Sequence, residues 1–326
     1  MNRPITLPCF TEEQKDRAHV LLAIRVAHMM GRKFEEGDWS YVYCRAKGIP
    51  EVSWSNLNID VAHENLGVEH KMLCYRSDAN LAQAFGTTLM HPSATRSIRV
   101  PSLDTDPNEA MRDILMQYGE LIQSRRSKIE KKNSTGKPVD MRTGWLLWQE
   151  SLRQFLYFEE PMVEPDANLY FAKWVERQVG EGVRKGSKNL WIFEKESGRK
   201  RYSVTTSAGA KIQPYFDIPP PNDPNVYLFT VIGEHISCGQ IRVWLTSSTA
   251  KDLERLVGSL NTEMVSDAVL HAVEKKVYGT EQNAVTLEET GISITLREDA
   301  YRALVEAFPG VNDEHCFRHF LEQMQG

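Results

Sequence analysis

The chain has 326 residues, of which 41% are hydrophobic and 25% charged, and its formal net charge is −5 at pH 7. This composition is typical of a globular protein with a full hydrophobic core, built as one large domain or two smaller ones. No apolar run is as long as a transmembrane helix, and the N-terminus has no apolar signal core, so we expect a cytoplasmic protein without membrane contact. The five cysteines are scattered without zinc-binding spacing, which favours reduced thiols.

The N-terminal region predicts one long helix and then an aromatic-rich connection. Residues 11–30 begin with Thr11 as a helix N-cap, continue with a broad apolar face and end at Gly31. Residues 37–52 contain several aromatic side chains, and we expect them to connect the helix to the first strand.

The next stretch of the chain has the pattern of a β-hairpin. Its predicted strands cover residues 58–61 and 67–73, and the turn between them contains an asparagine and a glycine. Side chains alternate along a strand, so Glu69 and Lys71 share one face. The opposite face contains Val68, His70 and Met72. Folding at the turn brings Asp60 back beside Glu69 and Lys71.

Two carboxylates and one ammonium group would then converge, and this combination suits phosphodiester hydrolysis. Carboxylate oxygens bind Mg²⁺, which keeps several of its waters and can contact a phosphate oxygen. The metal ion lowers the pKa of a bound water and offsets the charge that develops during in-line displacement. The ammonium group of Lys71 can orient or deprotonate the attacking water, or neutralise the phosphate.

The hairpin resembles the D…(D/E)xK signature of the PD-(D/E)XK nuclease superfamily, with Asp60 as the first acid and Glu69 to Lys71 as the triplet. The resemblance implies a restriction-endonuclease-like α/β fold, in which helices flank a mixed central sheet. It also implies that Asp60 and Glu69 bind Mg²⁺ together with the backbone carbonyl of His70. Lys71 would be the catalytic lysine. The chain departs from the signature at Ile59, which stands where proline is expected.

Many nucleases of this fold have an additional acid near the metal site, and the chain offers candidates by position only. These are Glu12, Glu13, Glu35 and Glu36. For Glu12 and Glu13 the alternative role is to complement a helix dipole. The hairpin itself has an alternative interpretation, a surface turn with a cross-strand ion pair.

Downstream of the hairpin, a run of hydroxyls and arginines indicates contacts with DNA phosphates. This run covers residues 87–99, and its candidate contacts are Arg96 and Arg99. A helix is then predicted over residues 107–122. The basic segment that follows, residues 124–138, is rich in Ser, Lys and Gly and predicts a mobile loop.

The sequence between residues 169 and 205 predicts one helix and one more hairpin. The helix covers residues 169–179. The hairpin pairs residues 189–194 with residues 200–205 and has a basic tip. Lys200 and Arg201 of this hairpin are candidate DNA contacts, because Lys and Arg can bind guanine edges in a groove.

The proline-rich stretch at residues 219–224 is the strongest linker signal. It divides the chain into a nuclease core with DNA-contacting loops, residues 1–218, and a smaller C-terminal strand-helix region, residues 225–326. The C-terminal region has predicted strands at 226–232, 240–246 and 292–296 and predicted helices at 250–257, 299–308 and 314–324. We expect this region to pack on the core or to mediate a homodimer.

Together these patterns predict a Mg²⁺-dependent endonuclease that hydrolyses double-stranded DNA, sequence-specific and dimeric in the manner of a type II restriction enzyme. One alternative is a structure-specific DNA-processing nuclease of the same fold. The other is a non-catalytic DNA-binding or assembly protein, which would bind DNA in a salt-sensitive manner without cutting it.

Overall fold

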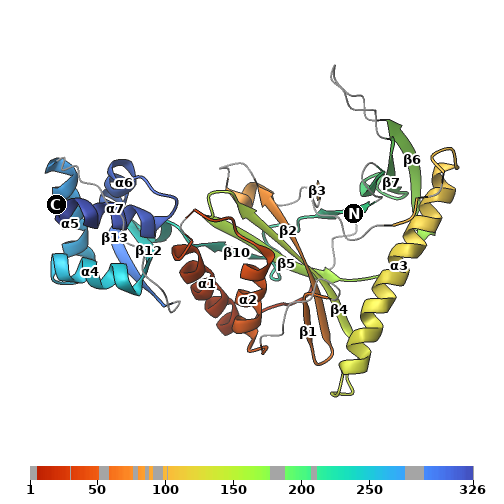
Figure 1. Cartoon of the computed structure of the whole chain (residues 1–326), viewed down its shortest axis with the longest axis horizontal. Helices are drawn as coiled ribbons and strands as arrows, with labels where there is room; N and C mark the ends of the chain where they lie inside the picture. Colours follow the sequence, from red (N-terminus) through yellow and green to blue (C-terminus); the bar gives the residue numbers. More distant parts are fainter. Residues whose placement is uncertain are drawn as a thin grey trace.

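The computed structural model describes residues 6–29, 31–50, 59–75, 80–84, 88–90, 98–100, 102–176, 188–206, 211–275 and 290–325. This part of the chain is a mixed α/β structure with seven α-helices and three β-sheets (Figure 1). The predicted fold class is therefore confirmed at this level, and the restriction-endonuclease-like fold stays a prediction. None of the helices in the described ranges is both long and apolar enough to cross a membrane.

The helices begin and end at local sequence signals. They are α1 (Glu12–Ala27), α2 (Glu36–Lys47), α3 (Pro107–Lys132), α4 (Ser247–Val257), α5 (Thr262–Lys275), α6 (Glu298–Ala307) and α7 (Asp313–Gln325). Two short 3₁₀ helices cover Leu81–Ala84 and Ala167–Leu169. The capping box of α1 joins Thr11 and Gln14, each side chain accepting a hydrogen bond from the other's backbone N–H.

The central sheet has five strands in the order β1-β2-β4-β5-β10. They are β1 (Val61–His63), β2 (Leu66–Tyr75), β4 (Asp140–Gln149), β5 (Gln154–Pro161) and β10 (Tyr227–Thr230). The β2–β4 pair is parallel and the other pairs are antiparallel. A parallel pair needs a long crossover connection, and here the crossover contains α3.

The second sheet has the order β3-β9-β8-β7-β6 and antiparallel pairing. Its strands are β3 (Thr88–Met90), β6 (Tyr170–Glu176), β7 (Lys188–Glu194), β8 (Lys200–Thr205) and β9 (Lys211–Asp217). The N-terminal half of α3 packs on this sheet, with Ile114 beside Leu190 and Ile192 in one buried cluster. The C-terminal half packs on the hairpin through Ile122 and Ile129. One helix therefore joins the second sheet to the hairpin (Figure 1).

Helices α1 and α2 cover the face of the central sheet opposite to α3 (Figure 1). Their buried side chains, among them Leu22, Trp39 and Tyr43, form one cluster with Val68 of β2 and Tyr157 of β5. The burial of large aromatic and aliphatic side chains here supplies much of the stabilisation of the sheet. The position of β2 is therefore set by packing on both of its faces.

The β1–β2 hairpin is closed by a two-residue turn and by a close approach of its backbone to α3. Glu64 of the turn has a φ of 52°. Gly67 lies in β2 and not in the turn, and a Cβ atom there would come within 2.9 Å of Ile129 and Met141. The glycine predicted to serve the turn is instead required by packing, because any side chain would push α3 and β4 away from the hairpin.

The C-terminal region is a separate layer of one sheet and four helices. Its strands are β11 (Glu234–Ser237), β12 (Gln240–Thr246) and β13 (Gly291–Arg297), in that order and antiparallel. Its own buried cluster includes Leu253, Phe317 and Phe320. β10, which follows the proline-rich stretch, belongs to the central sheet, so the chain completes the core before this layer begins.

The C-terminal layer docks on the end of α1 through Asn312, which is 2% exposed. Its amide nitrogen donates hydrogen bonds to the carbonyls of Val26 (2.7 Å) and Met29 (3.0 Å). Its side-chain oxygen accepts the N–H of His315 at 2.9 Å, at the start of α7. One buried side chain therefore completes two helix ends from distant parts of the chain.

Replacing Asn312 with alanine is expected to lower the free energy of unfolding by about 2–4 kcal/mol, because three buried hydrogen bonds of its side chain are lost. Denaturant unfolding of the full chain measures this. The matched control is Asn261→Ala, since the Asn261 side chain accepts the Met264 N–H at an exposed helix start. Its expected loss is about 1 kcal/mol. Equal losses in the two variants would show that the bonds to α1 contribute nothing.

Two segments that the sequence predicted as connections are helical. Residues 37–52 were expected to connect the first helix to a strand, but most of them form α2, because Trp39, Val42 and Ala46 bury one helical face. The predicted mobile loop at residues 124–138 is wrong over its first half, since α3 continues to Lys132. The many basic side chains of this segment favoured the loop prediction, although Ile129 supplies a buried apolar face.

The helix predicted over residues 169–179 is wrong over residues 170–176, and residues 177–179 lie outside the described residues. Tyr170–Glu176 is strand β6, which pairs with β7 along its whole length. Its aromatic side chains and valine favour an extended chain, and tertiary pairing with β7 overrides the weak helical pattern. The hairpin predicted from residues 189–205 is confirmed by the antiparallel pairing of β7 with β8.

Candidate active site

The start of the hairpin places two carboxylates and one lysine together. The register pairs Val61 with Val68, and its continuation puts Asp60 opposite Glu69. The Oδ2 atom of Asp60 accepts a hydrogen bond of 2.7 Å from the backbone N–H of His70. Asp60 is therefore held against β2 by the backbone, with its carboxylate next to that of Glu69.

Glu69 is the buried centre of the site, with 6% of its surface exposed. Its Oε1 atom accepts hydrogen bonds from Lys71 Nζ at 2.7 Å and from Arg125 Nη2 at 2.8 Å. Its Oε2 atom is buried and has no hydrogen-bond partner among the described residues. A buried carboxylate oxygen without a partner is costly. One oxygen of Glu69 is thus left for a ligand.

The carboxyl group of Asp60 is affected by both neighbouring acids. Burial, and then the negative charges of Glu69 and Glu36, raise the pKa of Asp60 to about 8. The N–H of His70 and the ammonium of Lys71 act in the opposite direction but do not offset this rise. Ionising neighbouring carboxyl groups together costs electrostatic free energy, and a bound cation lowers that cost. Glu36, at the start of α2, is therefore a candidate additional acid whose charge acts on Asp60.

The side chain of His70 is directed away from this site. It lies in the core, with ring centroids 5.0 Å from Tyr43 and 6.0 Å from Tyr157. Burial, and then the charge of Lys71, lower the pKa of His70 to about 3, so the ring stays neutral. The alternation predicted from the sequence is found: Glu69 and Lys71 line a cavity on one face, and His70 packs on the other.

The cavity in front of Glu69 has a volume of about 280 Å³ and lies between the two five-stranded sheets. One wall is built by α3 and strands β2, β4 and β5, and the other by strands β6 to β9. The side chains of Glu69 and Lys71 are only 7% and 11% exposed. A phosphate can therefore reach them only by entering this cavity.

A second carboxyl group, Glu160 of β5, lines the same cavity. Strand register sets it in one row with Glu69, because Glu69 pairs with Thr143 and Thr143 pairs with Glu160. Glu160 Oε1 accepts a 2.8 Å hydrogen bond from Trp145 Nε1. Burial is the main cause that raises the pKa of Glu160, to about 7.

Sequence reasoning missed both Arg125 and Glu160. Arg125 fell in the segment predicted as a loop, although Ile122 and Ile129 flank it at helical spacing and could have revealed its inward position. Glu160 has no comparable sequence signal, because its place beside the site depends on the order β2-β4-β5.

The candidate DNA contacts do not gather in one place. Arg201 lines the cavity, where its guanidinium binds Asp217 at 2.6 Å and Glu194 at 3.4 Å. Lys200 does not line the cavity, and its ammonium lies over the rings of Trp191 and Tyr215. The side chain of Arg99 is exposed, and Arg96 lies outside the described residues.

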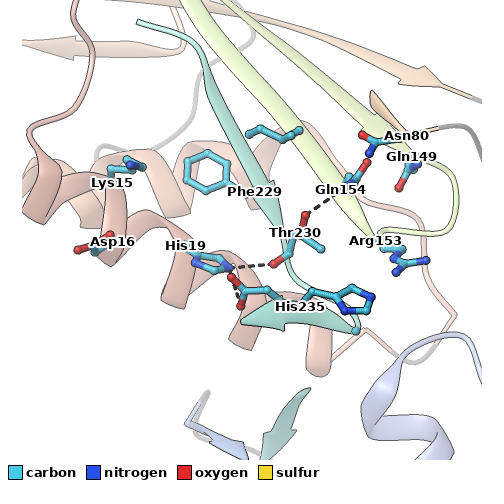
Figure 2. A pocket seen from close by; sticks show the side chains of 13 residues that line it. Lys15, Asp16, His19, Asn80, Gln149, Arg153, Gln154, Phe229, Thr230 and His235 are labelled. Carbon is cyan, nitrogen blue, oxygen red and sulfur yellow. Dashed lines mark hydrogen bonds and ion pairs between the residues drawn. The ribbon is translucent and has the colours of Figure 1, made fainter. Parts of the chain in front are cut away.

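A larger cavity, of about 520 Å³, lies between α1, the β4–β5 turn and strands β10 and β11 (Figure 2). Two of its ionic groups, His19 and Glu234, are already engaged: His19 Nε2 is 2.9 Å from the carbonyl of Thr230 and 3.7 Å from Glu234. Glu234 also binds Arg242 at 3.3 Å. This cavity has mixed charge and no pair of adjacent carboxylates beside a lysine, so the Glu69 cavity is the better candidate.

Asp60 and Glu69 suit a hard cation such as Mg²⁺, which takes one or two carboxylates and keeps several waters. No group of three or more His, Cys, Asp or Glu side chains that could hold a metal ion occurs among the described residues. The side-chain ligands would be the two carboxylates, and the unpartnered Oε2 atom of Glu69 fits that use. The backbone carbonyl of His70 stays a predicted further ligand. Comparisons of the chain with protein-family models, curated proteins and solved structures find no match.

Proposed function

We propose that this protein is a Mg²⁺-dependent endonuclease that hydrolyses DNA in the cavity between its two larger sheets. The observation that supports this most directly is Glu69, a buried carboxylate whose Oε1 atom binds two cations and whose Oε2 atom has no partner in the described chain. In an ordinary surface ion pair both carboxylate oxygens can be hydrated by solvent.

In this proposal Asp60 and Glu69 hold the metal ion, which supplies a bound water of lowered pKa and neutralises charge on the phosphate. Lys71, fixed by its 2.7 Å bond to Glu69, would orient the attacking water and neutralise charge on the phosphate. Arg125 compensates the negative charge of Glu69 from α3. The N–H of His70 keeps Asp60 in place.

Cleavage of an unpaired or distorted strand is the second candidate, and the depth of the site favours it. Glu69 and Lys71 are almost fully buried in a cavity of about 280 Å³, which admits a phosphate with its sugar more readily than an intact duplex. A sequence-specific enzyme acting on duplex DNA, working as a two-fold dimer, would need the two sheets to separate at this cavity.

The test is incubation of the purified full chain with linear duplex, single-stranded and forked DNA of known sequence, with Mg²⁺ or with EDTA, followed by mapping of the new ends. Mg²⁺-dependent ends at one short motif in the duplex support the sequence-specific nuclease. Ends confined to single strands or junctions support the structure-specific one. Binding without cleavage in every metal and every DNA form would leave a non-catalytic DNA-binding protein and overturn the nuclease proposal.

A further inference from the structure

The second sheet has an aromatic face that is only partly buried in the described chain. Strand alternation puts Phe171 and Lys173 of β6 on the same face, together with Trp191 and Phe193 of β7. The register pairs Phe171 with Phe193 and Lys173 with Trp191. The rings of Phe171 and Phe193 are stacked, with centroids 5.3 Å apart and an interplanar angle of 18°.

Basic side chains lie among these rings. Lys200 of β8 has its ammonium 3.9 Å from the centroid of Trp191 and 4.3 Å from that of Tyr215 on β9. Lys173 lies 5.8 Å from the centroid of Phe171. We call these six residues the aromatic strip: Phe171, Lys173, Trp191, Phe193, Lys200 and Tyr215.

The aromatic strip is partly exposed and is not part of a core. Its rings have intermediate exposure, and Phe171, Trp191 and Phe193 are outside the five buried clusters found among the described residues. Partly exposed rings that lie together with lysines on one face mark a surface where a partner can bury the remaining apolar area. The strip therefore has the composition of a contact surface.

The charge of this sheet suits a polyanion. The described residues of 170–176, 188–206 and 211–217 include seven Lys or Arg and four Asp or Glu, whereas the whole chain has a net charge of −5. A local excess of positive charge attracts phosphates. Rings interleaved with lysines bind unpaired bases by stacking while the ammonium groups contact the backbone.

The aromatic strip also begins at the rim of the proposed active site. Tyr215 lines the cavity that contains Glu69 and contacts Lys200. A bulge between Ile192 and Phe193 shifts the register, so that consecutive residues of β8 take different roles. Lys200 lies over the rings, and Arg201 lines the cavity.

We propose that the aromatic strip binds the unpaired bases of a single-stranded DNA segment and leads that strand to the cavity that contains Glu69. Stacking requires exposed base faces, which a duplex hides within its own stack. The inference deepens the proposed function, because it names the form of the substrate. Binding is measured without metal and cleavage with it, so each proposal can fail without the other.

The test is fluorescence anisotropy of a labelled thymidine oligonucleotide with the full chain in EDTA. Trp191→Leu and Phe193→Leu are each expected to weaken binding about fivefold or more, from the loss of one stacked ring. Trp191→Phe keeps a ring and is expected to retain most of the affinity. Lys200→Gln is expected to lower the slope of log K against log salt by about 0.7, the value for one phosphate contact on a single strand.

The matched control is Tyr41→Leu, since Tyr41 of α2 also has a cation over its ring, Arg25 at 5.2 Å, but lies outside the aromatic strip. This variant is expected to bind as the wild type does. Thermal melting confirms that each variant is folded. Wild-type affinity in both Trp191→Leu and Phe193→Leu overturns the proposal. Light scattering that shows an oligomer for the wild type and a monomer for these variants also overturns it, because the strip is then a contact between copies of the chain. Tighter binding of a uridine RNA of equal length overturns the assignment to DNA.

Discussion

Replacing Glu69 with glutamine is expected to lower the rate of DNA cleavage by at least about 10²- to 10³-fold while most DNA binding is kept. Glutamine preserves the volume but removes the negative charge that would hold the metal ion and that now neutralises Lys71 and Arg125. The measurement is the initial rate of plasmid nicking in Mg²⁺, together with DNA affinity in EDTA. Circular dichroism shows whether the variant keeps its fold.

The matched control is Glu64→Gln, the same change in charge at the exposed tip of the same hairpin. This variant is expected to cleave at the wild-type rate. Asp60→Ala and Lys71→Ala are expected to lower the cleavage rate as strongly as Glu69→Gln does, because the metal site and the water-orienting lysine act together. Full cleavage by all three site variants would exclude hydrolysis at this hairpin.

Replacing Gly144 with alanine is expected to lower the free energy of unfolding by about 3 kcal/mol or more, an effect of overpacking a rigid core. A Cβ atom at this position of β4 would overlap the hydroxyl of Tyr157 and come within 2.9 Å of His70 Cδ2. The Tyr157 hydroxyl cannot move freely, because it donates a buried 2.8 Å hydrogen bond to Glu159. Denaturant unfolding measures the loss.

A second glycine provides the control for this prediction. Gly119 lies within α3, and a Cβ atom there would meet its nearest neighbour, Glu164, at 3.9 Å. Gly119→Ala is therefore expected to stabilise the protein by up to about 1 kcal/mol through helix propensity. Equal stability of the wild type and Gly144→Ala would mean that β4 can shift at this point.

The elements that local patterns predict correctly are those whose pattern agrees with their tertiary surroundings. α1 has a cap and an apolar face, and in β2 the side chains of Glu69 and Lys71 lie on the face opposite to His70. The β7–β8 hairpin has a polar turn between two strands rich in aromatic and β-branched residues. Where composition and burial disagree, as in the basic but half-buried end of α3, local reasoning gives the wrong element.

The sequence by itself determined that Glu69 and Lys71 face one way and His70 the other, because alternation along a strand is a property of the backbone. It also placed Asp60 near Glu69, because a short hairpin is local. Both features hold in the structure.

Only the tertiary structure decided what surrounds these residues. Arg125 reaches Glu69 because α3 crosses over from β2 to β4, and Glu160 joins the row because β5 pairs with β4. The aromatic strip forms because four strands distant from the hairpin align its rings and lysines on one face, and because Tyr215 also lines the cavity that contains Glu69. Contacts between segments far apart in the chain depend on strand order and register, which no short stretch of sequence encodes.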